Sequence, residues 1–266
     1  TVLDWLLSTA EKHSIDVVLT VGMKAPRWPE FHFPDWVQDR YDTSNAGQPV
    51  DANPALADLT LNFIQTVMNH TKSSPCIKYW QVENEAFNTP DVAAGRCLSY
   101  NFVQREVALA REMASAGQRI LLTNGINLAP VDFAKRDEHA FKQSLSLADA
   151  VGINVYTKVG IFLGLYQTPL PVFWRKLAHW RESLVSAGKE AWITEAQAEP
   201  WEDKTLVATA RNAYPSSSPQ SATDAAITLG QLEYSPVLLW GCEYWYWQKM
   251  NERNHWWTTM EQFTQT

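Results

Sequence analysis

The sequence predicts an α/β fold in which helices cover a parallel sheet, because short apolar segments alternate with helical segments six times along the chain. No shift in composition marks a domain boundary within the 266 residues. An open doubly wound sheet that binds nucleotides has a glycine-rich phosphate turn after its first strand, and Gly22-Met23-Lys24 is not such a turn. We therefore predict one domain of the (β/α)8 TIM-barrel type over residues 1–266, incomplete at its amino terminus and with six βα units recognisable.

The expected elements follow from the spacing of the apolar residues, which is continuous in the buried strands and helical elsewhere. The expected strands are 16–22, 77–85, 120–124, 150–156, 192–195 and 237–245. The expected helices are 2–14, 54–67, 98–116, 135–147, 172–186 and 222–234. Asp51 or Asn53 caps the helix that begins at Pro54, and Gly117 ends the following one. The loop 23–34, rich in proline and aromatic residues, either contacts substrate or folds over the rim of the barrel.

The net charge of −7 argues against a nucleic-acid partner, because no basic stripe is present to release counterions. No apolar run reaches membrane-spanning length, and the first residues do not follow the basic, apolar, small-residue order of a secretory leader. We therefore expect neither nucleic acid nor membrane as a partner, and the cellular location stays open. Neutral ligands fit this charge better.

The aromatic content indicates the class of neutral ligand. Thirteen Trp and nine Tyr exceed what core filling requires, although over half of the Trp side chains are expected to pack in the core or at the rim. Flat aromatic faces stack on the apolar faces of sugar rings. The three cysteines, Cys76, Cys97 and Cys242, have no C-x-x-C spacing and indicate neither a zinc site nor a disulfide framework. We expect a carbohydrate ligand and no cofactor.

Two expected strands end in carboxylates. The strand 77–85 runs into Glu83-Asn84-Glu85, and the strand 192–195 ends at Glu195, which lies 195 − 85 = 110 residues after Glu85 with two further strands between them. Hydrolysis of a glycosidic bond requires a carboxylic acid that protonates the leaving oxygen and a carboxylate on the other side of the sugar carbon. Two strand-end glutamates are therefore the residues that this chemistry needs.

These strand ends resemble the signature of the clan A glycoside hydrolases. Asn84-Glu85 and Ile193-Thr194-Glu195 are similar to the segments in which that superfamily of (β/α)8 barrels carries its acid/base, on the fourth strand, and its nucleophile, on the seventh. The segment 81–85 is most like the acid/base segment of the β-galactosidase families in the clan. The strand count fits if 16–22 is the third strand, which leaves the first two strands missing.

The resemblance implies a retaining β-glycosidase or endo-β-glycanase that acts on an oligo- or polysaccharide. Glu85 would be the general acid/base and Glu195 the nucleophile, with their carboxyl groups about 5–5.5 Å apart and the charge of Glu195 raising the pKa of Glu85. Asn84 would bind the sugar 2-hydroxyl, and Tyr156 would touch the nucleophile. Trp245, or in second place Trp240, would be the sugar platform on the last strand.

Further residues lie on the catalytic side of their strands, and we expect about half of them to contact the substrate. This set is Lys24, Arg27, Trp28, Gln197, Glu199, Trp201 and Glu243, of which we favour Lys24, Trp28, Gln197 and Trp201. Glu83 faces the same way as Glu85 by strand alternation, which predicts a structural ion pair inside the barrel.

The pattern departs from the clan at strand two, where members carry an arginine that supports the nucleophile. An unclosed barrel exposes two strand edges, so we expect homo-oligomerisation near residues 1–22 and 237–250, or a rearrangement of the tail 251–266 into the gap.

Two alternative functions stay open. A carbohydrate-binding relic would keep the aromatic platforms without effective catalysis. A metal-dependent barrel hydrolase is disfavoured, because the six histidines lie away from the expected strand ends, apart from His32 in a loop. The sequence leaves the sugar, and exo or endo action, open.

Overall fold

A computed structural model describes residues 1–27, 30–41, 43, 48–88, 95–128, 132–161, 163–202 and 214–265. The chain forms two compact units, Thr1–Asn124 with Arg136–Val151 and Gly125–Lys135 with Gly152–Thr266. The expectation of a single domain stays a prediction.

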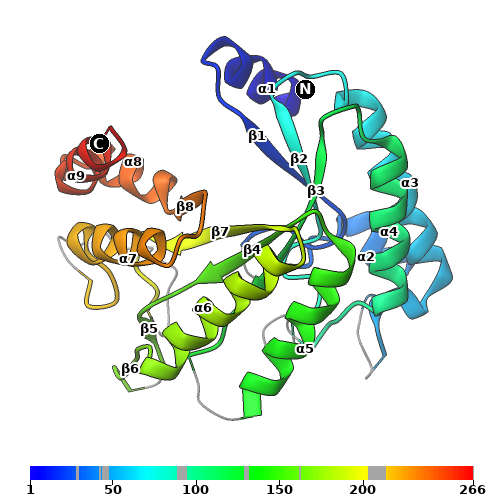
Figure 1. The fold of residues 1–266 in the computed structure, drawn as a ribbon. Coiled ribbons are helices and arrows are strands. Elements are labelled where there is room, and N and C mark those ends of the chain that lie inside the picture. The colour runs from blue at the N-terminus through cyan, green and yellow to red at the C-terminus, as the bar shows by residue number, and fades with distance from the viewer. Residues whose placement is uncertain are drawn as a thin grey trace. The chain divides into compact units, whose positions relative to one another are not determined.

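The first unit contains three βα repeats preceded by a helix (Figure 1). Its elements are α1 (Val2–Lys12), β1 (Val17–Val21), α2 (Asp35–Arg40), the short 3-10 helix η1 (Val50–Ala52), α3 (Pro54–Thr71), β2 (Ile77–Val82), α4 (Tyr100–Met113), β3 (Arg119–Gly125) and most of α5 (Asp132–Leu147). In this unit α3 and α4 pack against each other, and α4 packs against β2. The helices expected around β1 and β2 are therefore present.

The second unit contains the later strands and the carboxy-terminal helices. Its elements are most of β4 (Ala150–Val155), the short strands β5 (Val159–Gly160) and β6 (Tyr166–Gln167), α6 (Pro171–Ser186), β7 (Glu190–Gln197), α7 (Pro219–Gln231), β8 (Val237–Trp240), α8 (Cys242–Met250) and α9 (His255–Thr264). Helix α7 packs on β7 and β8, and α9 packs on α7 and α8.

The helices begin at capping residues that the sequence encodes. Asn53 is the N-cap of α3, since its side chain accepts from the backbone N–H of Ala55 at 3.1 Å. Asp51, the other candidate, instead accepts from the N–H and the hydroxyl of Ser99, at 2.8 and 2.6 Å. Because Ser99 is itself the N-cap of α4, Asp51 ties the start of α4 to the segment before α3.

The sheet order is β1-β2-β3-β4-β7-β8, and the pairs β1–β2, β2–β3 and β7–β8 are parallel. Every residue of β4 is buried, whereas four of the five residues of β1 and all four of β8 are only partly buried or exposed. A closed barrel would cover every strand on both sides. The chain therefore has the expected α/β fold of the (β/α)8 type with six recognisable units, and β1 and β8 are the end strands of the described sheet.

Two predicted strand ends are wrong. The strand expected over 77–85 ends at Val82, because Glu83 and Glu85 have positive φ. The strand expected over 237–245 ends at Trp240, and α8 follows, because Gly241 has a φ of 142° that breaks the extended run. The aromatic residues of this segment have high β propensity, but Tyr244 and Trp245 are buried in a core cluster. Ala198, Ala222, Trp256 and Met260 complete that cluster. Tertiary packing thus overrides the local preference.

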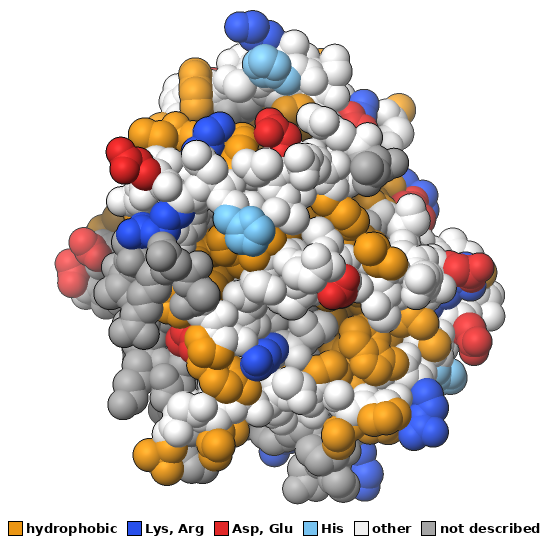
Figure 2. All heavy atoms as spheres, turned by 90° about the vertical axis from the view of Figure 1, so that its left-hand side faces the viewer, with side chains coloured by type: hydrophobic (Ala, Val, Ile, Leu, Met, Phe, Trp, Pro, Cys, Tyr) orange, Lys and Arg blue, Asp and Glu red, His pale blue; other side chains and the backbone are white. Residues whose placement is uncertain are grey.

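The second unit carries exposed apolar side chains on several elements. Figure 2, which faces the side where α7, α8 and α9 lie in Figure 1, shows hydrophobic side chains in separate patches between polar ones. Exposed apolar residues on β8 and α8 include Leu238, Tyr246 and Met250. Among the helices of the described ranges, none is long and apolar enough to cross a membrane.

The first unit carries an apolar stripe on α1 next to the end strand β1. Val2, Trp5 and Leu6 lie on one face of α1 and are 74%, 63% and 51% exposed. An end strand with a neighbouring apolar helix face is a surface that a second copy of the chain can cover. Self-association through this stripe is therefore our expectation for the protein in solution.

We expect Leu6→Glu to shift the protein toward monomer, because the charge would be buried without a partner in the contact. Sedimentation velocity over a range of concentrations measures the shift, and Ser8→Glu, which adds the same charge at another exposed position of α1, is the matched control. A wild type that stays monomeric at every concentration would contradict the expectation.

Candidate active site

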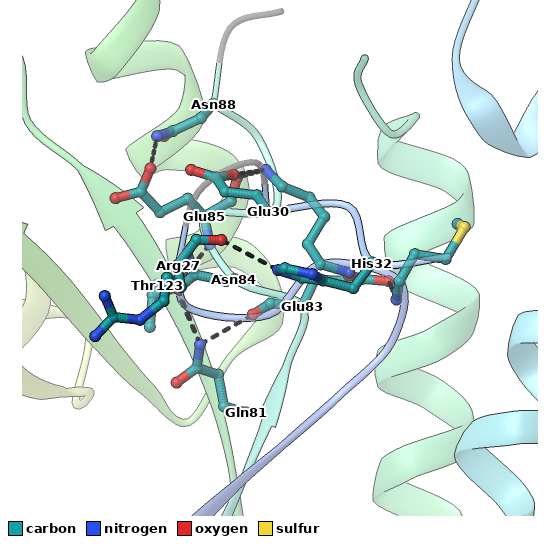
Figure 3. A network of polar contacts seen from close by, with 11 residues as sticks. Arg27, Glu30, His32, Gln81, Glu83, Asn84, Glu85, Asn88 and Thr123 are labelled. Carbon is teal, nitrogen blue, oxygen red and sulfur yellow. Dashed lines mark hydrogen bonds and ion pairs between the residues drawn. The ribbon is translucent and has the colours of Figure 1, made fainter. Parts of the chain in front are cut away.

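The turn after β2 holds two acidic residues in an unusual backbone conformation. Glu83 and Glu85 have φ values of 60° and 46°, in the left-handed region that side chains other than glycine rarely adopt. Each such residue costs on the order of 1 kcal/mol and persists only where surrounding contacts enforce it. The contacts around this turn therefore show how the chain holds it (Figure 3).

Backbone hydrogen bonds join the turn to the segment after β1. The N–H of Glu83 donates to the carbonyl of Val21 at 2.8 Å, and the N–H of Asn84 donates to the carbonyl of Lys24 at 3.1 Å. The Nζ of Lys24 donates to the carbonyl of Glu85 at 2.7 Å, and the N–H of Glu85 donates to the hydroxyl of Thr123 on β3 at 2.8 Å. The turn is thus fixed from both neighbouring strands.

The carboxyl group of Glu85 lies at the edge of this network. The residue is 8% exposed, and its Oε2 accepts a hydrogen bond from the Nδ2 of Asn88 (Figure 3). Glu30 lies nearby in the figure, and its carboxylate forms an ion pair with the Nζ of Lys24 at 2.9 Å. Lys24 is therefore bonded to the backbone of Glu85 and to Glu30 at once.

Lys24 is buried, with 2% exposure, and its ammonium also lies 5.5 Å from the ring centroid of Phe31. The expectation that Lys24 contacts substrate stays a prediction, while its observed contacts make it a support of the Glu85 turn. Trp28, another expected substrate contact, lies outside the described residues.

Two hydrogen bonds to the amide oxygen of Asn84 fix the orientation of its side chain. The oxygen accepts from the Nε2 of Gln81 and from the hydroxyl of Thr123, each at 3.2 Å. No described residue accepts a hydrogen bond from its Nδ2, although the residue is only 3% exposed. A fixed amide with an N–H₂ group left for another acceptor suits a contact with a hydroxyl group.

Glu83 is fully buried and accepts two backbone hydrogen bonds. Its carboxylate takes the N–H groups of Met23 and Lys24, at 2.8 and 2.5 Å. Gly22 allows this approach, because a Cβ atom there would overlap the carboxyl group of Glu83. The predicted structural role of Glu83 agrees with these contacts, although the observed hydrogen bonds come from backbone N–H groups, whereas an ion pair was expected.

Glu106 was missed by sequence reasoning. It lies on α4, is fully buried, and lies close enough to Glu83 for each carboxyl group to act on the pKa of the other. Burial, followed by the charge of Glu83, raises the pKa of Glu106 well above its usual range. Burial also raises the pKa of Glu83. The neighbouring carboxyl group of Glu106, the two backbone N–H groups and the charge of Lys24 act in the opposite direction. The signal in the sequence is an acidic residue within an apolar helical stripe, Val103, Glu106, Val107 and Ala110.

In the second unit, Glu195 lies on β7 and is bound by a tyrosine. The hydroxyl of Tyr156, directly after β4, donates to the Oε2 of Glu195 at 2.5 Å. The ring of Tyr156 lies 4.6 Å from that of Trp201, at an interplanar angle of 59°. The indole N–H of Trp201 is buried and has no hydrogen-bond partner within the described part of the chain. Three of the expected site residues, Tyr156, Glu195 and Trp201, thus lie together.

Contacts between β4 and β7 fix the position of Glu195. The hydroxyl of Thr194 donates to the Oδ1 of Asn154 at 2.7 Å. Gly152 makes room for this threonine, because a Cβ atom at that position would overlap its side chain. The residue before Glu195 is therefore bonded to β4, the strand that Tyr156 directly follows.

Gln197 and Glu199 follow Glu195 and hold protein groups. The amide of Gln197 accepts from the N–H of Lys158 at 2.9 Å and donates to the carbonyl of the same residue at 2.8 Å. Glu199 accepts from the indole N–H of Trp240 at 2.9 Å. Substrate contact by Gln197 stays a prediction, and the observed bonds clamp the segment after Tyr156.

The expected position of Trp245 is wrong. It lies on α8 and not at a strand end, is 8% exposed, and donates its indole N–H to the carbonyl of Ala198 at 2.7 Å. Trp240, the second choice, ends β8 and is only partly buried. Trp240 is therefore the residue that the structure places where a strand-end platform was expected.

A further acidic residue was not anticipated. Glu202 accepts from the hydroxyl of Ser216 at 2.6 Å and from that of Tyr166 at 2.5 Å. Burial opposes ionisation, but these hydrogen bonds and the charge of Lys158 hold the pKa of Glu202 below its usual value. This cluster ties β6 to the segments on both sides of the undescribed residues 203–213. Across the described ranges, no three His, Cys, Asp or Glu side chains are arranged to hold a metal ion.

Comparisons with known proteins identify the fold. No family model matches the chain, and no curated protein sequence matches it. Among solved structures, the β-galactosidase from the psychrophilic Marinomonas ef1 matches with a TM-score of 0.59 and 12% identity, over 90% of this chain and 46% of that one. CbXyn10B matches with a TM-score of 0.53 and 17% identity, over 90% and 69%.

A putative α-L-fucosidase from Bacteroides thetaiotaomicron matches with a TM-score of 0.53 and 10% identity, over 89% of this chain and 63% of that one. The chain spans 28% of the length of two β-glucuronidases that it also matches, from Faecalibacterium prausnitzii and Bifidobacterium dentium. The chain shares its fold with these solved structures, among them a β-galactosidase and a putative α-L-fucosidase, and the expected (β/α)8-type fold is confirmed. At these identities the comparison shows the fold alone.

The raised pKa of Glu106 gives a prediction about stability. When folding raises the pKa of a carboxyl group, the folded state holds the proton more tightly than the unfolded state does. The protonated group then contributes its full stability below the unfolded pKa. This contribution is lost as the pH rises from the unfolded pKa toward the folded pKa. Glu83, Asp51 and Arg105 are the charged groups that act on it. We expect the free energy of unfolding of the wild type to fall by about 1.4 kcal/mol per pH unit above about pH 4.3 because of Glu106. Glu106→Gln does not ionise and should not show this fall.

Denaturant unfolding of the wild type and Glu106→Gln between pH 4 and pH 8 measures this difference, with Glu112→Gln as the control at an exposed position of α4. Parallel curves for the wild type and Glu106→Gln would contradict the raised pKa.

Proposed function

We propose that this chain is a retaining β-glycosidase or endo-β-glycanase that cleaves an oligo- or polysaccharide by double displacement. Glu195 is the nucleophile and Glu85 the general acid/base. The observation that carries the proposal is the hydrogen bond from Tyr156 to Glu195 at 2.5 Å, on a strand whose order in the sheet matches the nucleophile strand of the clan. The glycoside hydrolase fold supports the reaction class.

The contact with Tyr156 suits a nucleophile for two reasons. A hydrogen bond to a carboxylate favours its ionised form, which is the form that attacks. The bond also orients one oxygen of Glu195 and leaves the other for the sugar carbon. Locking of Thr194 to Asn154 keeps this geometry in place before substrate binds.

The surroundings of Glu85 suit a proton donor. The residue follows the carboxyl end of the parallel strand β2, where barrel enzymes of this fold carry their catalytic side chains. The backbone of Glu85 is bonded to Lys24 and Thr123, so the side chain starts from a fixed position. Neighbouring Asn84 offers its amide N–H₂ to the sugar 2-hydroxyl, a contact that strengthens in the transition state.

In the first step, Glu85 gives its proton to the glycosidic oxygen while a carboxylate oxygen of Glu195 attacks the anomeric carbon. The carbon–oxygen bond to the leaving group breaks, the alcohol departs, and a glycosyl ester of Glu195 forms. In the second step, water gives a proton to the carboxylate of Glu85 and attacks the anomeric carbon, which releases Glu195 and the sugar with its original configuration. The proposal therefore requires the two carboxyl groups to lie about 5–5.5 Å apart.

Aromatic residues supply the surface for the sugar. Trp201 contacts Tyr156 and carries an indole N–H without a partner among the described residues, and Trp240 ends β8. An aromatic face with a polar edge suits a ring that has apolar faces and hydroxyls at its rim. We propose Trp201 and Trp240 as the sugar platforms.

Loss of either carboxylate is expected to stop hydrolysis of aryl β-glycosides, tested as glucoside, galactoside, mannoside, xyloside and cellobioside. Azide should restore turnover of Glu195→Ala and give a glycosyl azide of inverted configuration, because azide then attacks the sugar directly. In Glu85→Ala azide should give the retained configuration, because it intercepts the glycosyl ester. Removal of the nucleophile is expected to cost at least about 10³-fold in kcat.

The matched controls are Glu112→Ala and Glu182→Ala, which remove exposed carboxylates from α4 and α6. We expect both to keep wild-type rates. A folded wild type that cleaves no substrate, while sugars still quench its tryptophan fluorescence, would overturn the proposal in favour of a carbohydrate-binding protein.

A further inference from the structure

Glu106 reaches the proposed acid/base through a continuous chain of contacts in the first unit. The carboxyl group of Glu106 lies next to that of Glu83, and Glu83 accepts the backbone N–H groups of Met23 and Lys24. The carbonyl of Lys24 accepts from Asn84, and the Nζ of Lys24 donates to the carbonyl of Glu85. Every link in this chain is buried.

The surroundings of Glu106 favour its protonated form. Both of its carboxyl oxygens are buried, and neither receives a hydrogen bond from the described residues. An ionised carboxylate without donors would be strongly destabilised, because burial of an unpaired charge costs several kcal/mol. A protonated carboxyl group needs no such donors and has one proton to give. Glu83 is the carboxylate that acts most strongly on Glu106, and its own oxygens already receive two N–H groups and so suit the ionised form.

We propose that Glu106 is a positioning residue that donates its carboxylic proton to the carboxylate of Glu83, and that this buried pair holds Lys24 and the Glu85 turn in the geometry of acid catalysis. The proposal rests on the assignment of Glu85 as the general acid/base. The pair shares one proton and carries one negative charge, which the positive charge of Lys24 stabilises.

The backbone strain at the turn explains why such support is needed. Glu83 and Glu85 both have positive φ, and a turn of this kind relaxes when its tethers weaken. Without the proton from Glu106, the Glu83 carboxylate loses a donor in a site that water does not reach, and its hold on Met23 and Lys24 weakens. Displacement of the acid/base by about 1 Å is enough to cost about 10²-fold in rate.

The test compares Glu106→Gln with Glu106→Met. Glutamine keeps a donor toward Glu83 and has nearly the same shape, whereas methionine keeps the volume and loses the donor. The substrates are aryl β-glycosides of the sugar that the wild type cleaves best, with dinitrophenol as a leaving group that needs no proton and phenol as one that does. Glu112→Gln is the control for the substitution itself.

For Glu106→Met we expect kcat for the phenyl glycoside to fall about 10- to 100-fold with little change in KM, because general acid catalysis contributes about 10²–10⁴-fold. The formation of the glycosyl ester from the dinitrophenyl glycoside, followed as a burst, should stay within about threefold of wild type. Glu106→Gln should rescue the phenyl glycoside to near wild-type rates. Equal losses on both leaving groups, or no rescue by glutamine, would overturn the positioning role.

A second measurement reads the shared proton without any activity. The measurement is an infrared difference spectrum at pH 8 between the wild type and Glu106→Gln. It should show the carbonyl stretch of a protonated carboxylic acid in the wild type. The difference spectrum between the wild type and Glu112→Gln should not show this band. Absence of this band would overturn the inference even if the wild type is an active glycosidase. If the band is present and no glycoside is cleaved, the proposed function fails, and with it the catalytic part of the inference.

Discussion

The buried carboxylate of Glu83 is the interaction on which the first half of the candidate site depends. One side chain accepts two consecutive backbone N–H groups after β1 and thereby joins the end of β1 to the turn after β2. Gly22 has no side chain because the carboxyl group occupies that space, and Glu106 approaches from α4. A left-handed turn of two glutamates is stable here because these contacts fix it, and it leaves the Glu85 side chain at the strand end.

In the second unit, neutral groups hold the proposed catalytic carboxylate in place. Tyr156 donates to Glu195, and the hydroxyl of Thr194 fixes the preceding residue to Asn154. Gln197 then binds both backbone groups of Lys158, so the segment that follows Tyr156 is clamped to the end of β7. In each unit the proposed catalytic carboxylate is therefore set by contacts between neighbouring strands, which suits a site that is organised before substrate arrives.

Much of this organisation was predictable from the sequence. The alternation of apolar strands and helices gave the fold class, and the acidic residues at strand ends gave Glu85, Glu195 and their neighbours. The error at 237–245 arose because aromatic residues favour strands locally, while Gly241 and the burial of Trp245 against α9 decide the outcome. Glu106 was overlooked because a long-range partner explains it, although its place in an apolar stripe was visible. The ties between Glu202, Tyr166 and Ser216 join segments far apart in the chain and have no local signal.

The central claim is that Glu195 forms a covalent bond to the sugar. Incubation with a 2-deoxy-2-fluoro glycoside of the preferred sugar, bearing a good leaving group, slows the second step and lets the glycosyl ester accumulate. Peptide mass spectrometry of the trapped protein should find one added fluoroglycosyl group on the peptide that contains Glu195, and Glu195→Ala should carry none. A label on another carboxylate, or steady turnover of unmodified glycosides by a protein that is never labelled, would contradict the account.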